Sequence, residues 1–523
     1  MTPKRQLLII VLLALALRLW GLDWGLPNAQ HYFSYHPDEI TVSASAVSIA
    51  STGDLNPHFF NYGSLYIYLL ALPLALAGGA ALAVATLAGR LLTVCFGAAT
   101  VALLFAFARR TLGGRWAWAP SLLLAVLPLH VVHSHFATVD VPVAFFVLLA
   151  LYLTVLAAER ESLRLLAVAG AVSGLAAATK YNGGAVLLIP LAAAFITPRL
   201  RSTAFVAVFA TAGAALAAFL LACPYALLDW PAFSQAVAFE MRHGRIGGTY
   251  AFLNTPPAPL YHLIVSLPNG ATGLFIPIFL LGVVLAAVRR NAATTTALAW
   301  VVLWWLVIGL SREKFIRYLI PALPAMTLLA CLPLAQVGAH RAWRWAVGGW
   351  WAFTLVVCVV WSAAHLRTFS AVDPRDRAAE WLRGSASPQR VIALLDIPWY
   401  NSPPICPWNG GLRSAKEFTD WNATATPKIL PLRWDFAPLE RREADYVVFA
   451  EVEVKDLGRA GDPRAKALYD ALRAGYTLAA TFDGKPRIHG FPIEQTYPPP
   501  DWEYVTPTLY VYRRADTEDG EPR

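Results

Sequence analysis

The sequence predicts an α-helical polytopic membrane protein of about 11 transmembrane helices, with a small C-terminal α/β domain outside the membrane. Of the 523 residues, 57% are hydrophobic and only 14% are charged, against roughly 25% charged residues in an average soluble protein. Apolar runs long enough to cross a bilayer recur through residues 1–365. Residues 366–523 instead alternate short strand and helix patterns. This composition excludes an ordinary soluble enzyme.

A transmembrane helix needs about 20 mostly apolar residues. Placing Lys4-Arg5 and the short arginine-containing loops in the cytoplasm satisfies the positive-inside rule with eleven crossings, which leaves residues 366–523 outside. Residues 62–80 are also apolar, but a crossing there would reverse every later loop, so we expect them to be interfacial or re-entrant. The predicted spans are 6–22, 87–108, 116–134, 140–158, 163–179, 184–198, 203–223, 272–288, 295–310, 318–336 and 345–363.

The charge of the chain is unevenly distributed. Residues 1–365 hold 21 basic and ten acidic residues, so most of the net charge of +9 lies in loops between apolar runs. A membrane orients this pattern, and we expect no nucleic-acid partner. The five cysteines form no pair or cluster that would indicate a disulfide framework or a thiolate zinc site. The N-terminal apolar run continues past a weak cleavage pattern and predicts a retained signal-anchor helix.

The two predicted domains are 1–365, within the membrane, and 366–523, outside it. In the second domain, the patterns predict helices over 377–383 and 465–474 and strands over 391–395, 446–450 and 509–512. Residues 401–440 are rich in Pro, Trp and Asn and predict a loop. Strands that alternate with helices favour a small α/β domain.

The first outer loop contains the motif His36-Pro37-Asp38-Glu39. Pro37 suits the first turn of a helix through residues 41–51, which would place both carboxylates at the start of that helix. They could simply balance the helix dipole. Alternatively, the motif holds a carboxylate at the membrane surface for proton abstraction.

A second polar group, His133, His135 and Asp140, lies at the outer junction of two spans. Asp140 opens an apolar helix, where an N-capping role is the structural alternative. Two histidines and a carboxylate could bind a divalent cation, but an i, i+2 histidine pair in a loop is weak evidence. The sequence therefore allows a metal ion without requiring one.

Cationic residues also occur in the predicted outer loops, against the positive-inside tendency. Lys180 either extends to lipid headgroups or binds a phosphate as a point charge. His243 and Arg245 lie in the 224–271 loop, and Arg317 and Tyr318 immediately precede a span. Cations and a few carboxylates on one face of a helical bundle suit a membrane-anchored anionic substrate.

In order along residues 1–340, the His36-Pro37-Asp38-Glu39 loop, the outer Asp140, Thr179-Lys180-Tyr181 and the run Arg317 to Pro324 resemble the GT-C superfamily. The most similar branch is the protein O-mannosyltransferase and lipid A aminoarabinose transferase group, whose donor is a polyprenyl-phosphate sugar. The resemblance implies a GT-C fold and a glycosyltransferase activity that depends on a phospholipid carrier.

The resemblance also implies roles for individual residues. Asp38 would be the catalytic base, Glu39 its acidic neighbour and Asp140 a second carboxylate near the sugar. Arg245 and Tyr318 fall where relatives hold the carrier phosphate. Further candidates are Lys180 and Arg317 for the phosphate and His36, His133, His135 and His243 for the lining of the site. The chain departs at Asn61 to Leu65, where aminoarabinose transferases have a Glu-Lys-Pro-Pro-Leu pattern, so a metal ligand and one phosphate contact of the relatives are missing.

These expectations describe an inverting glycosyltransferase of a bacterial inner membrane. It would move a sugar from a polyprenyl-phosphate donor to a hydroxyl of a lipid, glycan or protein acceptor on the outer face. A phosphate leaving group needs cationic stabilisation more than a general acid, so one carboxylate can suffice. The alternative is a transporter or flippase of a lipid-linked glycan, which would place polar sites near the bilayer midplane on broken, repeated helices.

Overall fold

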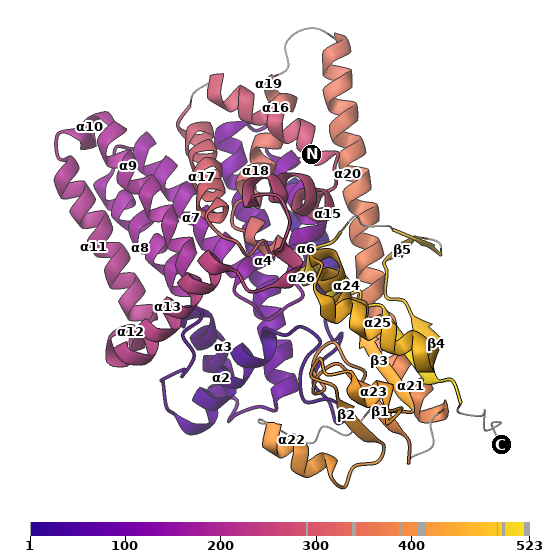
Figure 1. Cartoon of the computed structure of the whole chain (residues 1–523). Coiled ribbons are helices and arrows are strands. Elements are labelled where there is room, and N and C mark those ends of the chain that lie inside the picture. Colours follow the sequence, from indigo (N-terminus) through magenta and orange to yellow (C-terminus); the bar gives the residue numbers. More distant parts are fainter. Residues whose placement is uncertain are drawn as a thin grey trace. The chain divides into compact units, whose positions relative to one another are not determined.

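The computed structural model describes residues 2–288, 291–336, 341–385, 389–405, 415–488, 490–493 and 497–516 (Figure 1). The chain forms two compact units. The membrane unit comprises residues 1–22, 41–248 and 255–366, and the C-terminal unit comprises residues 23–40, 249–254 and 367–523. The C-terminal unit thus contains two segments, 23–40 and 249–254, that come from earlier in the chain.

The regular secondary structure described in the membrane unit is entirely helical, as the apolar sequence predicts. Its helices are α1 (Pro3–Leu19), α2 (Glu39–Thr52), α3 (Leu65–Leu76), α4 (Leu82–Thr111), α5 (Trp118–Val126), α6 (Pro128–His133), α7 (Asp140–Glu159), α8 (Leu163–Thr179), η1 (Tyr181–Leu187), α9 (Leu188–Ile196), α10 (Pro198–Arg201), α11 (Ala204–Ala222), α12 (Tyr225–Leu228), α13 (Trp230–Ile246), α14 (Ala258–Tyr261), η3 (His262–Ser266), α15 (Leu267–Ala271), α16 (Phe275–Val288), α17 (Ala292–Gly309), η4 (Ile316–Leu319), α18 (Leu323–Ala330), α19 (Leu332–Gln336) and α20 (Arg341–Ser370).

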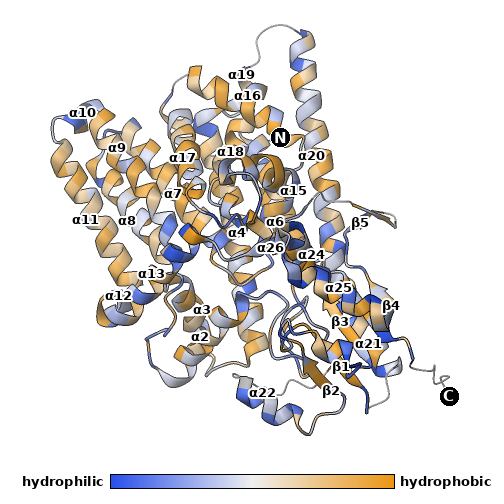
Figure 2. Ribbon diagram, viewed as in Figure 1, coloured by the Kyte–Doolittle hydropathy of each residue, from blue (hydrophilic) through white to orange (hydrophobic). Residues whose placement is uncertain are grey.

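Within the described residues, five helical segments are long and apolar enough to cross a membrane: α4, α7, α11, α17 and the segment that contains α20. A sixth candidate is the pair 258–271 and 275–288, which bends by 119°. In Figure 2 the ribbons of these helices are coloured mostly as hydrophobic residues. Several other predicted spans are short or interrupted: 116–134 is divided between α5 and α6 at Pro128, and 318–336 becomes η4, α18 and α19. The number eleven remains a prediction.

The apolar segment 62–80 contains only the 12-residue helix α3. At 1.5 Å per residue this helix is about 18 Å long, shorter than the hydrocarbon core of roughly 30 Å. Pro73 lies inside α3, and Gly78 and Gly79 follow it with φ of 79° and 101°, a backbone conformation that glycine adopts without strain. The helix by itself cannot span the membrane.

Close packing fixes α8, which carries Lys180 at its C-terminal end. A Cβ atom at Gly170 would lie 2.2 Å from the Thr211 carbonyl oxygen of α11, and one at Gly174 would lie 2.1 Å from that of Ala215. The Gly-xxx-Gly spacing therefore lets two helix backbones approach without intervening side chains. Any larger residue at either position would separate the helices and shift Lys180.

The C-terminal unit combines a mixed sheet with short helices. The strand order is β2-β1-β3-β7-β4; β1 is parallel to β2 and β3, whereas β7 is antiparallel to β3 and β4. A separate pair, β5 and β6, is antiparallel. The elements of the C-terminal unit are η2 (Tyr250–Phe252), α21 (Pro374–Ser385), β1 (Val391–Leu394), α22 (Ala415–Asn422), β2 (Lys428–Pro431), α23 (Ala437–Glu440), β3 (Tyr446–Ala450), α24 (Glu451–Ala460), α25 (Pro463–Gly475), β4 (Tyr476–Phe482), β5 (Arg487–Ile488), β6 (Phe491–Pro492), α26 (Pro500–Glu503) and β7 (Leu509–Arg514).

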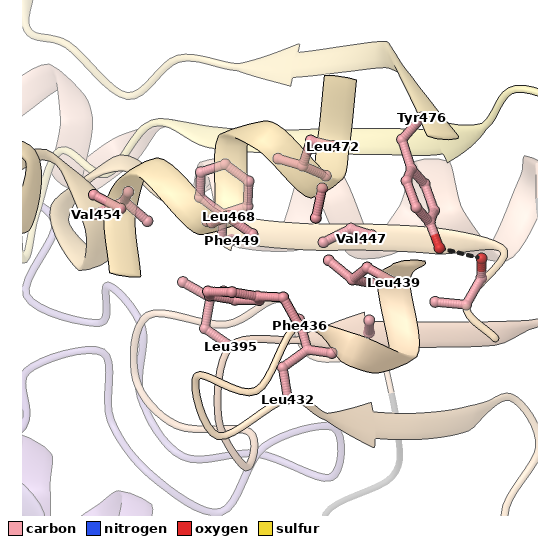
Figure 3. Close-up of a cluster of buried hydrophobic side chains, with 14 of the residues drawn as sticks. Leu395, Leu432, Phe436, Leu439, Val447, Phe449, Val454, Leu468, Leu472 and Tyr476 are labelled. Atoms are coloured by element: carbon pink, nitrogen blue, oxygen red, sulfur yellow. Dashed lines mark hydrogen bonds between the residues drawn. The ribbon is translucent and has the colours of Figure 1, made fainter. Parts of the chain in front are cut away.

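The strand and helix predictions for this unit are confirmed for β1, β3, β7, α21 and α25. The core between the sheet and α24–α25 contains Val447, Phe449, Leu468 and Leu472, and the Tyr476 hydroxyl donates to the Ala444 carbonyl at 3.0 Å (Figure 3). The loop prediction over 401–440 is wrong in part, because α22, β2 and α23 form there. Residues 406–414 of that prediction lie outside the described residues.

Buried polar contacts attach the first outer loop to the C-terminal unit. Arg375 donates to both carboxylate oxygens of Asp373 at 2.7 and 2.8 Å, and its guanidinium lies 3.8 Å from the ring centroid of Tyr35. The Tyr35 hydroxyl donates to Asp376 at 2.5 Å, and the Trp24 indole donates to Asp373 at 3.1 Å. Burial raises the pKa of Tyr35 and of Asp376 above their ordinary values. The loop is therefore part of the C-terminal unit's structure.

Candidate active site

A pocket of about 500 Å³ opens at one end of the membrane unit. The loop before α3, η1, α13, the end of α17 and η4 all contribute to its walls. Three of the four predicted phosphate-binding residues line it: Lys180, Arg245 and Tyr318. These three residues are far apart in sequence. The sequence predicts only that they lie on the same face of the bundle, whereas the fold brings them into one pocket. Volumes of roughly 300–1,000 Å³ are typical of small-molecule sites.

Asp140 and Lys180 form a buried ion pair beside this pocket. The Lys180 ammonium nitrogen donates to Asp140 Oδ1 at 2.7 Å, and the two side chains are 12% and 4% exposed. Asp140 is the first residue of α7, but its neighbour Val139 is the N-cap and no side chain caps the helix. Both structural alternatives are therefore wrong: Asp140 is not the N-cap, and Lys180 does not extend to headgroups. Arg317 and His133 also act electrostatically on the Asp140 carboxylate.

Two tyrosines flank the Lys180 ammonium. Its nitrogen lies 5.3 Å from the ring centroid of Tyr318 and 5.9 Å from that of Tyr62, distances typical of cation–π contacts. Tyr318 is held through its backbone, whose carbonyl accepts from the Trp304 indole at 2.7 Å. Tyr181 fixes the opposite wall, since its hydroxyl lies 2.9 Å from the carbonyl oxygens of both Phe60 and Tyr62. The walls around Lys180 are thus preorganised.

Arg245 contrasts with Lys180 because its side chain is exposed. It lies in the last turn of α13, where a cation interacts favourably with the helix dipole. The Arg312 amide donates to the Gly244 carbonyl at 2.8 Å, and the Gly248 amide donates to buried Glu313 at 2.6 Å. These bonds hold the end of α13 against the 311–313 segment. Arg245 can therefore offer its guanidinium to a ligand from a fixed backbone.

The sequence did not single out Glu240 or assign a role to Asn61. Both line the pocket, and the Asn61 amide donates to Glu240 Oε1 at 2.6 Å. Asn61 occupies the segment where aminoarabinose transferases have Glu-Lys. In this chain the carboxylate of Glu240 thus reaches that segment from α13. Separation of 179 residues in the chain hides this contact from any local pattern.

Two of the three predicted catalytic carboxylates, Asp38 and Glu39, lie at the start of α2, in the part of the chain that groups with the C-terminal unit. α2 begins at Glu39, directly after Pro37-Asp38, and confirms the predicted helix. Asp38 is half-buried and Glu39 is fully buried. The Asp38 backbone amide donates to His36 Nδ1 at 3.3 Å, and the His36 ring packs edge-on against Tyr504 at 5.3 Å. His36 thus shapes the turn that holds Asp38.

The predicted histidines do not gather around a metal position. His135 is held between the carbonyl oxygens of Val131 and Trp20, 2.9 and 3.0 Å from its ring nitrogens, so its role is structural. His243 stacks on Phe239 and lies 3.8 Å from Glu313. His133 is buried and packs edge-on against Phe136. Among the described residues there is no group of three or more His, Cys, Asp or Glu side chains that could hold a metal ion, and the suggested His133–His135–Asp140 site is not formed.

Comparison with known proteins bears on these features. Residues 64–227 match the sequence model of the family described as dolichyl-phosphate-mannose-protein mannosyltransferase. This segment includes Asp140 and Lys180 but ends before α13. No curated protein sequence matches the chain.

Solved structures are similar over most of the chain. ArnT from Cupriavidus metallidurans bound to undecaprenyl phosphate is 15% identical, with a TM-score of 0.53 and coverage of 96% of this chain and 97% of ArnT. The chain has the GT-C glycosyltransferase fold. The apo form of ArnT gives a TM-score of 0.50 at 16% identity over the same shares of both chains. The apo oligosaccharyltransferase of Archaeoglobus fulgidus gives 0.50 at 13% identity, over 89% of this chain and 72% of that one.

The GT-C fold confirms the fold class predicted from the order of the short motifs. It also explains why the local sequence is weakly informative, because structures of 13–16% identity share this fold. In this chain the Asp140–Lys180 pair and the pocket beside it lie at helix ends of the membrane unit.

Proposed function

We propose that this protein transfers a sugar from a polyprenyl-phosphate donor to an acceptor hydroxyl at the outer face of the membrane. The observation that carries the proposal is the pocket in which Lys180, Arg245 and Tyr318 meet at one end of an apolar helical bundle. Lipid-linked anions reach such a site from the bilayer. ArnT, which has the same fold, is described as bound to undecaprenyl phosphate, a ligand of the class that we propose for the donor.

The charges at the two ends of the bundle support an orientation for this pocket. α7 runs about 30 Å from Asp140, beside the pocket, to Glu159, which pairs with Arg110 at the end of α4. Near that second end the Glu161 carboxylate accepts from the Arg199 backbone amide at 3.4 Å. Arginines concentrate there, as positive-inside ordering expects of a cytoplasmic face. We therefore place the pocket on the extracytoplasmic side, with a bacterial inner membrane as the setting.

The proposed chemistry is inversion at the anomeric carbon. Asp38 takes the proton of the acceptor hydroxyl while the oxygen of that hydroxyl bonds to the anomeric carbon. At the same time the bond from the anomeric carbon to the carrier phosphate breaks. The phosphate leaves with the electron pair and needs cations rather than a proton donor. Lys180 and Arg245 supply that charge, with Arg317 and Tyr318 as further contributors. General-base assistance contributes roughly 10²–10⁴-fold, and positioning supplies more.

Transport of a lipid-linked glycan is the competing function. Transporters usually place their polar sites near the bilayer midplane on broken helices. The polar pocket here lies at helix ends, and α7 and α11 carry no charged residue between their terminal turns. The bent pair 258–271 and 275–288 is the feature that a transporter would use. Transfer of label from donor to acceptor by purified protein distinguishes the two functions, because a transporter would leave the donor intact.

Arg245→Ala should weaken binding of polyprenyl phosphate about tenfold, because a charge-assisted contact to the phosphate is lost. The exposed side chain contributes little to folding, so thermal unfolding of the purified variant should be unchanged. Arg242→Ala is the matched control: it removes an exposed arginine from the same helix at a position that does not line the pocket. Equal donor affinity in Arg245→Ala and wild type would exclude Arg245 from phosphate binding.

A topology reporter tests the orientation. The eleven-crossing arrangement places residues 366–523 outside, so alkaline phosphatase fused after Arg367 should be active. A fusion within the loop at 160–162 should be inactive, since that end of α7 faces the cytoplasm in the proposal. Reversed activities at the two positions would contradict both the orientation and an outer-face site.

A further inference from the structure

The C-terminal unit has a pocket of its own, with a volume of about 390 Å³. It lies at the carboxyl ends of β1 and β3, where Asp396 follows β1 and Glu453 lies in the first turn of α24, directly after β3. The strand order β2-β1-β3 means that the chain passes from β1 to β2 on one side and returns to β3 on the other. In sheets of parallel strands, ligands bind at this kind of topological switch point, outside the carboxyl ends of the strands.

The lining of this pocket includes aromatic rings and uncharged hydrogen-bonding groups. Trp399, Tyr400 and Trp434 contribute rings, and Asn401 contributes an amide. Trp399 is 40% exposed, although large apolar side chains are usually covered. Such rings offer flat apolar faces to the C–H faces of a sugar ring, while the nearby amide and carboxylates can bond its hydroxyls.

The charges of the lining residues restrict the class of ligand that this pocket can bind. Asp396 and Glu453 are the ionisable acids of the lining, and none of the described residues that line it is basic. A phosphate, nucleotide or acidic sugar would meet the Asp396 carboxylate and a partly ionised Glu453, with no cation among the lining residues, and Coulomb repulsion would disfavour it. The pocket therefore fits a polyhydroxylated ligand without negative charge.

The turn that presents Trp434 has an unusual backbone. Arg433 and Trp434 have φ values of 50° and 65°, a left-handed conformation that is rare for bulky residues. The turn is held because the amides of Leu432 and Arg433 donate to the carbonyls of Leu394 and Leu395, each at 2.8 Å. Strain of this kind is concentrated at binding sites, where surrounding bonds maintain it.

Contacts around the indole fix its position further. The Arg464 guanidinium lies 5.2 Å from the Trp434 ring centroid, and Phe436 packs edge-on at 6.3 Å. Trp399 is fixed by a tight turn, in which its backbone amide donates to the Ser402 hydroxyl at 2.7 Å. The Trp434 indole and the Trp399 backbone are thus held in the walls of one pocket, which reduces the entropy lost on binding.

Glu453 has a structural role as well as a place in the lining. Its carboxylate accepts from the Ala450 amide at 2.8 Å at the start of α24. Burial raises the pKa of Glu453 to about 7, against hydrogen bonds from Ala450 and Asn401 that lower it. Near neutral pH the group is thus partly protonated and can both donate to and accept from a hydroxyl.

We propose that the pocket between Asp396, Trp399, Trp434 and Glu453 binds a sugar unit that carries no negative charge. This site gives the C-terminal unit a carbohydrate-binding function of its own. It does not depend on the proposed transferase reaction, because every residue that carries it belongs to the C-terminal unit.

The test measures binding by the full chain in lipid nanodiscs, since glycoside detergents would compete for the pocket. Saturation-transfer difference NMR with methyl glycosides of neutral hexoses and N-acetylhexosamines should show transfer to at least one of them. Trp399→Ala should weaken that binding at least about tenfold, because a stacking face is lost. Phe491→Ala is the matched control, since it removes a 78% exposed ring of the same unit away from this pocket.

Two further measurements complete the design. Asp396→Asn keeps the shape of the lining but removes a charge, so neutral glycosides should still bind while a uronic acid glycoside binds more tightly than to wild type. Inorganic phosphate should not compete. The proposal is overturned if no glycoside shows transfer, if Trp399→Ala and Phe491→Ala bind alike, or if phosphate displaces the glycoside.

Discussion

Replacing Asp38 by Asn should lower the turnover of sugar transfer at least about a hundredfold, the usual lower range for loss of a general base. The amide keeps the shape of the carboxylate but cannot take the acceptor proton at neutral pH. Donor binding should survive in this variant, since the cations proposed for the phosphate are unchanged. The measurement is transfer from a labelled polyprenyl-phosphate sugar by purified wild-type and variant protein, with donor affinity determined in parallel.

Asp54→Asn provides the control for this measurement. Asp54 is an exposed carboxylate just after α2, 4 residues from its hydrogen-bond partner His58. Its loss should leave turnover within about twofold of wild type, as surface changes usually do. Near-normal turnover in Asp38→Asn would remove Asp38 from the mechanism. Asp140 would then be the next candidate for the base, although it forms an ion pair with Lys180.

Replacing Lys180 by Met should both destabilise the membrane unit and weaken donor binding. Asp140 would lose the partner that compensates its buried charge, which typically costs on the order of 3 kcal/mol. The phosphate would lose a cation held between two tyrosine rings. Thermal unfolding in nanodiscs and equilibrium binding of polyprenyl phosphate measure the two effects separately.

The double variant Asp140→Asn with Lys180→Met separates a structural role of Lys180 from a binding role. Removing both charges should restore most of the lost stability, because no uncompensated charge remains. Donor binding should stay weak if Lys180 contacts the phosphate. If the double variant regains wild-type affinity for the donor, Lys180 serves only to neutralise Asp140. If Lys180→Met alone is as stable as wild type, the ion pair does not contribute to the stability of the membrane unit.

The fold class could be predicted from sequence because apolar length and strand alternation are local properties. β3 agrees with its predicted limits, and α7 begins at Asp140, where the predicted span begins. The span 116–134 is predicted as one helix although it contains Pro128, a residue that interrupts helices, and the structure begins a separate helix there. Residues 428–431 also form β2 in a stretch whose composition indicated a loop, because pairing with β1 outweighs local preference.

The candidate site was predictable only in part. Lys180, Arg245 and Tyr318 could be named from charge and motif, but their convergence on one pocket depends on tertiary packing. Asp140 illustrates the difference: its position predicts a helix cap, and only the fold shows that a lysine 40 residues away is its partner. Glu240 could not be identified as a pocket residue from sequence, because its hydrogen-bond partner Asn61 lies in a loop that is distant in the chain.

The attachment of residues 23–40 to the C-terminal unit has a consequence for the design of chimeras and for the evolution of the chain. Trp24 and Tyr35 are structural partners of Asp373, Arg375 and Asp376, so the three-dimensional module is assembled from separate stretches of the gene. A chimera joined at residue 367 would combine a foreign C-terminal region with a native loop that no longer fits it. Exchange of the module requires residues 23–40, 249–254 and 367 onward together, and substitutions in these stretches should covary among homologues.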